Sequence, residues 1–362
     1  MPPRPEVRPD LAALHGYHSP QVDVAVRLNT NEAPAPPPDA WSEALVKELA
    51  AVEWNRYPDR AAAELRAAIA DHHGVRPDQV FAANGSNESI QALCLAYGGA
   101  GRSVALFEPT YPLHSHIARI TGTGVLEGGR APDLSLDPDA AIALIAAGAP
   151  ALTFLCSPNN PTGMLEAPET VAAVADAAAA AGGLLVVDEA YGQFAPWSAL
   201  ALVDDDRPVV VTRTYSKTWS MAGARLGYLV GPSWLVAELE KVTLPYHLDA
   251  VKQIAGRLAL RFDAEMRERV AALVEERGRL FAALTDLPVD VWPSAANFVL
   301  FRPRTRDGHD VWQGLLDRSV LVRDCSAWPG LDGCLRVTVG TADEDDRFLS
   351  ALAATLDAGG QP

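Results

Sequence analysis

Short apolar runs alternate with amphipathic segments over the first two thirds of the chain. The runs that we expect to be strands lie at residues 79–83, 103–111, 151–156, 183–188 and 208–212. Helical periodicity covers residues 40–53, 59–73, 87–97 and 168–181. Strands buried on both faces of a parallel sheet are apolar throughout, as these runs are. The pattern therefore predicts an α/β fold with a mostly parallel central sheet between helices.

A different order of elements follows residue 230. Two long amphipathic helices are predicted at 233–260 and 262–285, and we interpret the first as the link to a second domain. Strands at 297–301, 320–323 and 334–339 and a helix at 343–357 complete a smaller α+β domain. Residues 1–40 are rich in proline and alanine, which indicates an extended, weakly packed arm. We expect an arm (1–40), a large domain (41–247) and a small domain (248–362).

Length and charge restrict the possible partners. A chain of 362 residues is too long for one small core, so a large domain and a smaller one are expected. Its 30 basic and 46 acidic side chains give a net charge of −16, which disfavours binding to nucleic acid or to an anionic membrane. An anionic small substrate would need local arginines. The N-terminus has no apolar core typical of a signal peptide, and we expect a cytoplasmic protein.

Cysteine spacing argues against a metal site or a disulfide framework. The cysteines are Cys94, Cys156, Cys325 and Cys334, and no C-x-x-C pair occurs. Reduced thiols and no bound metal are expected.

Lys217 follows the strand at 208–212 and a turn rich in threonine and serine. A lysine amine can form a Schiff base with an aldehyde, while Thr214, Ser216 and Arg225 could hold a nearby phosphate. Lys217 taken alone is better explained as a surface lysine beside a tight turn. The polar and aromatic residues that follow the upstream strands favour the interpretation of Lys217 as a Schiff-base lysine.

Several other predicted strands also end in polar or aromatic side chains. Gly85–Asn87 lead from a strand into a helix N-terminus, which can bind an anion, although an ordinary βα turn has the same pattern. Asp188 ends an apolar strand, and a buried acid needs a cationic partner unless it only caps a helix. Tyr111, Asn160 and Tyr191 follow strands in the same way.

The carboxyl ends of parallel strands share one edge, where ligands of open sheets bind. Pyridoxal phosphate needs a carboxylate for its ring nitrogen, donors to its phenolate oxygen, a stacking ring, phosphate ligands and an amine, all of which are present here. Arg323 and Arg336 lie in apolar strands of the small domain. Each could be a solvated strand residue, but together they favour an anion clamp.

The chain resembles the class I/II, fold type I aminotransferases, and among them most the histidinol-phosphate aminotransferase family. The resemblance covers about Tyr17 to Phe348. The motifs that carry it are Leu28–Glu32, Arg56–Asp59, Asn84–Glu88, Ser157–Gly163, Val187–Tyr191, Ser216–Arg225, Leu321–Asp324 and Cys334–Thr341. Their shared order and spacing make the match specific.

The resemblance implies a role for each matching residue. Lys217 would bind the pyridoxal 5'-phosphate aldehyde and then move the substrate proton, and Asp188 would pair with the ring nitrogen. Asn160 and Tyr191 would bond the phenolate oxygen, and Tyr111 would stack on the ring. The implied phosphate ligands are Gly85, Ser86, Asn87, Thr214, Ser216, Arg225 and, from the second subunit of a homodimer, Tyr57. The implied substrate ligands are Tyr17, Asn31, Arg323 and Arg336.

The family's reaction is amino transfer from L-histidinol phosphate to 2-oxoglutarate in histidine biosynthesis. Aromatic amino acid transamination and threonine-phosphate decarboxylation remain alternatives, because both share these motifs. Two positions depart from the family pattern. Thr218-Trp219 replaces an alanine and an aromatic after the lysine, and His114 stands where a second tyrosine is common, which leaves the amino donor open.

Overall fold

The computed structural model describes the chain except residues 1–3, 13, 15, 17–21 and 359–362. Its larger sheet has seven strands in the order β2-β8-β7-β6-β5-β3-β4. These strands are β2 (Val80–Ala83), β3 (Ser103–Glu108), β4 (Gly124–Gly129), β5 (Leu152–Cys156), β6 (Leu184–Asp188), β7 (Val209–Thr214) and β8 (Gly227–Val230). All neighbours run parallel except β8, which is antiparallel to both β2 and β7. The prediction of a mostly parallel central sheet is confirmed.

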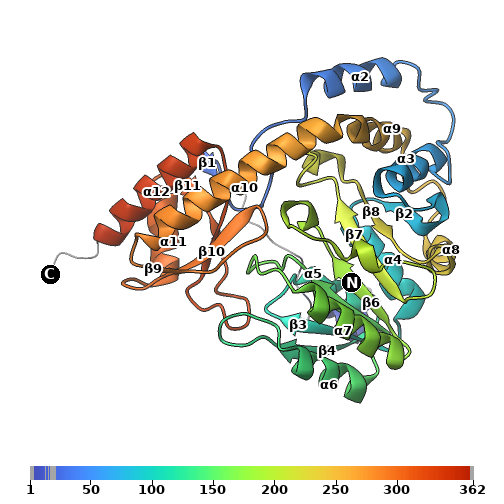
Figure 1. The fold of residues 1–362 in the computed structure, drawn as a ribbon, viewed down its shortest axis with the longest axis horizontal. Helices are drawn as coiled ribbons and strands as arrows, with labels where there is room; N and C mark the ends of the chain where they lie inside the picture. Colours follow the sequence, from blue (N-terminus) through green and yellow to red (C-terminus); the bar gives the residue numbers. More distant parts are fainter. Residues whose placement is uncertain (1–3, 13, 15, 17–21, 359–362) are drawn as a thin grey trace.

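Helices cover both faces of this sheet (Figure 1). One face packs against α4 (Ser86–Tyr97), α5 (Leu113–Ile120) and α8 (Ser233–Val242), and the other against α6 (Pro138–Gly148) and α7 (Pro168–Ala180). Consecutive strand residues point to opposite faces, so Val186 lies in the first core and Val187 in the second. Burial on both sides explains the continuous apolar strands.

The small domain is built on a four-stranded antiparallel sheet in the order β12-β13-β10-β9. Its strands are β9 (Val289–Val291), β10 (Phe298–Pro303), β12 (Arg323–Asp324) and β13 (Leu335–Thr338). The helices α10 (Asp263–Thr285), α11 (Gly308–Leu316) and α12 (Ala342–Asp357) enclose its core. No helix in the described part of the chain is long and apolar enough to span a membrane.

The predicted single helix over 233–260 is wrong. The structure has two helices there, α8 and α9 (Ala250–Ala259), separated by a turn that contains Pro245 and Tyr246. Proline cannot continue a helix, and Tyr246 has a positive φ of 61°. The link between the domains is instead α10, which runs from one to the other in Figure 1.

The position of α9 also indicates where the small domain begins. That helix packs against α3 (Ala63–His73) and α2 (Asp39–Leu49), both in the large domain. We therefore propose that the small domain begins within α10 rather than at residue 248.

Part of the predicted arm is packed into the protein, which corrects the expectation that residues 1–40 are weakly packed throughout. Strand β1 (Val26–Arg27) pairs in parallel with β11 (Val320–Leu321), and Val26 and Leu28 belong to the small-domain core. Asn29 and Asn31 are also buried. The preceding helix α1 (Pro9–Ala12) has no buried residue.

Candidate active site

A cavity of about 370 Å³ lies at the carboxyl ends of the parallel strands and is also lined by residues of the small domain. The structure brings together in its lining Asn31, Ser86, Asn87, Tyr111, Asn160, Asp188, Tyr191, Thr214, Ser216, Lys217, Arg225, Arg323 and Arg336. Gly85 directly precedes Ser86, at the start of α4. Tyr17 lies outside the described residues, and Tyr57 does not line this cavity.

Asp188 ends the buried strand β6 with only 1% of its surface exposed. The Thr212 hydroxyl and the Ala190 backbone N–H donate to its Oδ1 at 3.0 and 3.1 Å. These contacts fix the carboxylate at the sheet edge and leave it able to pair with a cationic or protonated group in the cavity.

His114 is the partner of Asp188 that the sequence did not identify. Its Nε2 lies 2.9 Å from Asp188 Oδ2, and both side chains are buried. A carboxylate only accepts hydrogen bonds, so Nε2 carries the proton when Asp188 is ionised. The imidazole stacks on Phe154 and meets the Tyr111 ring edge-on, which orients it further. No pattern in the sequence around His114 indicates this contact, because the two residues are 74 positions apart.

Lys217 extends from the turn after β7 to the centre of the cavity. Its ammonium donates to the Thr30 carbonyl at 3.0 Å and lies 5.8 Å from the centre of the Tyr191 ring. Burial, with the nearby Arg336 and Arg225 charges, lowers the Lys217 pKa to about 7. About half of the amine is therefore neutral near pH 7 and able to act as a nucleophile and base.

An anion site lies at the start of α4. Ser216 Oγ accepts from Arg225 at 3.3 Å and from Thr214 at 3.0 Å, so both hydroxyls and the guanidinium share one corner. Gly85 has a φ of +82°, and a Cβ there would lie 3.1 Å from the Arg225 guanidinium. This close approach places a cation beside the free N–H groups of a helix N-terminus, an arrangement suited to phosphate.

Asn31 and Tyr191 form a polar wall beside Lys217. The Asn31 amide donates to the Tyr191 hydroxyl at 2.9 Å, and the Thr338 hydroxyl accepts from the Asn31 backbone N–H at 3.0 Å. Burial raises the Tyr191 pKa to about 12, so the phenol keeps its proton and can donate to an oxygen in the cavity.

Arg323 and Arg336 are direct register partners on β12 and β13, so both side chains leave the same face of the sheet. Arg336 is buried; it donates to the Asn160 side-chain oxygen and, at 3.1 Å, to the Asn29 carbonyl. Its Nε has no partner among the described residues. Two like charges opposite each other are destabilising unless an anion joins them.

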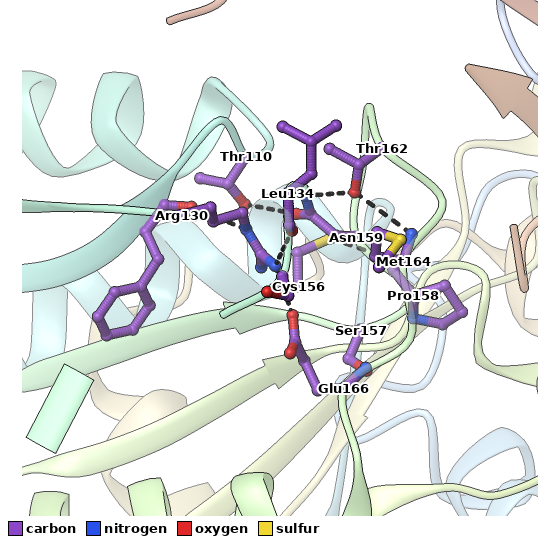
Figure 2. Close-up of polar contacts among 12 residues, drawn as sticks. Thr110, Arg130, Leu134, Cys156, Ser157, Pro158, Asn159, Thr162, Met164 and Glu166 are labelled. Carbon is purple, nitrogen blue, oxygen red and sulfur yellow. Dashed lines mark hydrogen bonds and ion pairs between the residues drawn. The ribbon is translucent and has the colours of Figure 1, made fainter. Parts of the chain in front are cut away.

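The loop after β5 that carries Asn160 rests on a buried polar cluster. Arg130 and Glu166 form an ion pair of 2.6 Å, and both side chains are almost fully buried. Figure 2 shows the two side chains pointing toward each other. Ser157 Oγ accepts from the Glu166 backbone N–H at 3.1 Å, and Asn159 bonds to Thr110 and Thr162. These contacts fix the backbone on either side of Asn160.

The chemical groups that line the cavity are those needed to bind pyridoxal phosphate. A buried acid, a lysine of lowered pKa, a phenol with an amide, and a hydroxyl-arginine corner are the groups that the cofactor needs, and they lie in one enclosure. The Tyr111 ring, whose hydroxyl donates to Asn87 at 3.2 Å, lines the same space.

Comparison with known proteins assigns the family. Residues 23–352 match the family described as aminotransferase class I and II. A histidinol-phosphate aminotransferase of Frankia casuarinae is 47% identical, over 97% of this chain and 90% of the relative. A histidinol-phosphate aminotransferase of Mycobacterium avium is 44% identical, over 96% and 89%.

A solved structure shows the same fold. The histidinol-phosphate aminotransferase of Sinorhizobium meliloti, in complex with pyridoxal-5'-phosphate, superposes with a TM-score of 0.87 at 23% identity, over 97% of this chain and 98% of that one. The family match and the sequence relatives make the assignment, and the structure agrees with it in fold: the chain belongs to the class I and II aminotransferases and groups among them with the histidinol-phosphate aminotransferases.

Proposed function

We propose that this protein transfers the amino group of L-histidinol phosphate to 2-oxoglutarate, forming imidazole acetol phosphate and L-glutamate, in histidine biosynthesis. The observation that carries the proposal is the register pair of Arg323 and Arg336 on one wall of the Lys217 cavity. The names of the relatives that are 44–47% identical over nearly the whole chain support it.

The arginine pair suits a phosphate monoester. Such a group carries nearly two negative charges at neutral pH and can accept hydrogen bonds from both guanidinium groups. A single carboxylate needs only one bidentate partner, and Arg336 supplies it for 2-oxoglutarate. In a chain of net charge −16, these side chains provide the local attraction that the overall charge does not.

The residues of the cavity have different parts in the proposed amino transfer. Bound pyridoxal phosphate supplies an aldehyde that takes up the amino group and a ring that withdraws electrons from the carbon bearing it. The Lys217 amine takes the proton from the donor's α-carbon, and its lowered pKa matches that task. Asp188 would hold a proton at the ring nitrogen of the bound cofactor, and Asn160 and Tyr191 would donate to its ring oxygen. Ser86, Ser216 and Arg225 would hold its phosphate.

The active form that we propose is a cytoplasmic homodimer with shared sites. Tyr57 is 80% exposed and stacks on the half-exposed Tyr246 with ring centres 4.5 Å apart, away from the cavity of its own chain. Trp54 and Leu244 are also exposed. A subunit contact over this apolar surface would bury it and bring Tyr57 to the phosphate corner of the second subunit.

We expect Lys217 of the cofactor-free protein to react with acetic anhydride along a titration curve centred near pH 7, because only the neutral amine attacks. The exposed Lys47, labelled in the same samples, serves as the internal control. Mass spectrometry of peptides labelled between about pH 5 and pH 9 measures both. A Lys217 curve that follows Lys47 would contradict the lowered pKa.

Arg323→Ala should lower kcat/KM for histidinol phosphate by roughly ten- to a hundredfold, because one charge-assisted partner of the phosphate is lost. The loss with phenylalanine as donor should be smaller, since Arg336 remains. Arg302→Ala, an exposed arginine on β10, is the matched control. Glutamate formation from a panel of donors gives the values.

Two results of the donor panel would replace the proposed reaction. Equal efficiency of wild type with phenylalanine and histidinol phosphate would indicate an aromatic aminotransferase. Carbon dioxide released from threonine phosphate would indicate a decarboxylase.

Mixing Tyr57→Phe with Lys217→Ala should restore activity when each variant alone is severely impaired, because exchanged dimers contain one site with both residues intact. Subunit exchange is checked independently by mass spectrometry of differently labelled chains. Exchange without any recovered activity would show that Tyr57 does not act across a subunit boundary.

A further inference from the structure

Trp328 lines the cavity beside Arg323. It lies between β12 and β13, in the small domain. The Arg323 guanidinium lies 5.2 Å from the centre of the indole ring. On its other side the indole N–H donates to the backbone carbonyl of Thr110, at 3.0 Å, in the large domain. One side chain therefore contacts an arginine of one domain and the backbone of the other.

The acceptor of that hydrogen bond is itself fixed. Thr110 Oγ1 donates to Asn159 Oδ1 at 3.0 Å, and the Asn159 amide donates to the Pro109 carbonyl and to Thr162 Oγ1, both at 2.9 Å (Figure 2). Asn159 is fully buried, and it directly precedes Asn160, which accepts from Arg336. Arg336 is thus held directly by the loop after β5, through Asn160. Arg323 is connected to the same loop indirectly, because Trp328 contacts Thr110, which bonds to Asn159.

Apolar packing holds the indole from behind. Trp328 packs on a cluster in which Leu134 and Met164 of the large domain meet Leu300, Cys325 and Leu331 of the small domain. The ring therefore has a fixed plane, one face of which is available to Arg323. A guanidinium over an aromatic face is attracted to it and loses few further rotamers when it binds an anion.

We propose that Trp328 is a positioning residue for Arg323: it holds the guanidinium at the cavity wall and ties β12 to the segment that carries Tyr111. The affinity for the donor's anionic group then depends on Trp328 although the indole does not bind that group. The identity of the donor rests on the function proposed above, whereas the coupling between the two side chains does not.

Trp328→Leu should raise KM for histidinol phosphate about five- to tenfold and leave kcat within about twofold, because the binding of the anionic group is weakened while Lys217 is untouched. Trp292→Leu is the matched control. Trp292 packs on the same apolar cluster and has an arginine, Arg302, 5.6 Å from its ring, but it does not line the cavity. Equal kinetic effects of the two substitutions would reduce Trp328 to a packing residue and overturn the proposal.

A double-mutant cycle with Arg323→Ala tests the coupling directly. We expect Trp328→Leu to change KM by less than about twofold once Arg323 is absent. An undiminished effect in that background contradicts the proposal. Trp328→Phe keeps the ring face but not the N–H, and it should recover part of the KM. If the leucine variant does not fold, as judged by the cofactor absorbance and thermal midpoint, the phenylalanine variant completes the cycle.

The cycle remains informative if the proposed reaction is wrong. If the proposed reaction is wrong, wild type will have a higher kcat/KM with a donor other than histidinol phosphate. The cycle is then run with the preferred donor, and coupling between Trp328 and Arg323 supports the positioning role while its absence rejects it.

Discussion

The site depends on one buried carboxylate. Asp188 ends the apolar strand β6 near the middle of the sheet, where an unpaired charge costs several kcal/mol. Thr212, the Ala190 backbone and His114 compensate part of that cost. The same strand sets the positions of its neighbours. Asp188 is the register partner of Cys156 on β5 and of Thr212 on β7. Asn160 and Lys217, a few residues beyond those partners, are therefore carried to opposite sides of the carboxylate.

Positive charge is concentrated in the cavity of an otherwise acidic chain. Arg225, Arg323 and Arg336 line it together with Lys217, and burial together with the charges of Arg336 and Arg225 lowers the pKa of the lysine. The same arrangement thus serves both halves of the proposed chemistry. It attracts anionic cofactor and substrate groups, and it releases the amine that must act as nucleophile and base. Anchoring through Asn160 and Trp328 keeps the cations in place while they repel one another.

The parts of the site that follow strands were predictable from sequence. An apolar run fixes where a parallel strand ends, so Asp188 and Lys217 could be assigned to one edge before their distance was known. The register of β12 against β13 was not predictable, because the strands are short and separated by a long loop, yet it decides that Arg323 faces Arg336.

Contacts between distant segments lay beyond the sequence patterns. Nothing local to His114 or Trp328 shows that one meets Asp188 and the other the Thr110 carbonyl. The burial of Val26 and Leu28 escaped prediction for a similar reason: β1 is a two-residue strand whose partner, Val320–Leu321, is almost three hundred residues away. The break at Pro245 could have been recognised, since proline interrupts helical periodicity.

Asp188 is proposed to keep the ring nitrogen of bound pyridoxal phosphate protonated. The ¹⁵N chemical shift of ring-labelled pyridoxal phosphate, bound to wild type and to Asp188→Asn, reports this directly. Asparagine preserves the shape of the side chain and removes its charge. We expect the shift of a protonated pyridine in wild type at neutral pH and that of an unprotonated pyridine in the variant. An unprotonated nitrogen in wild type, or the same shift in both proteins, would contradict the account.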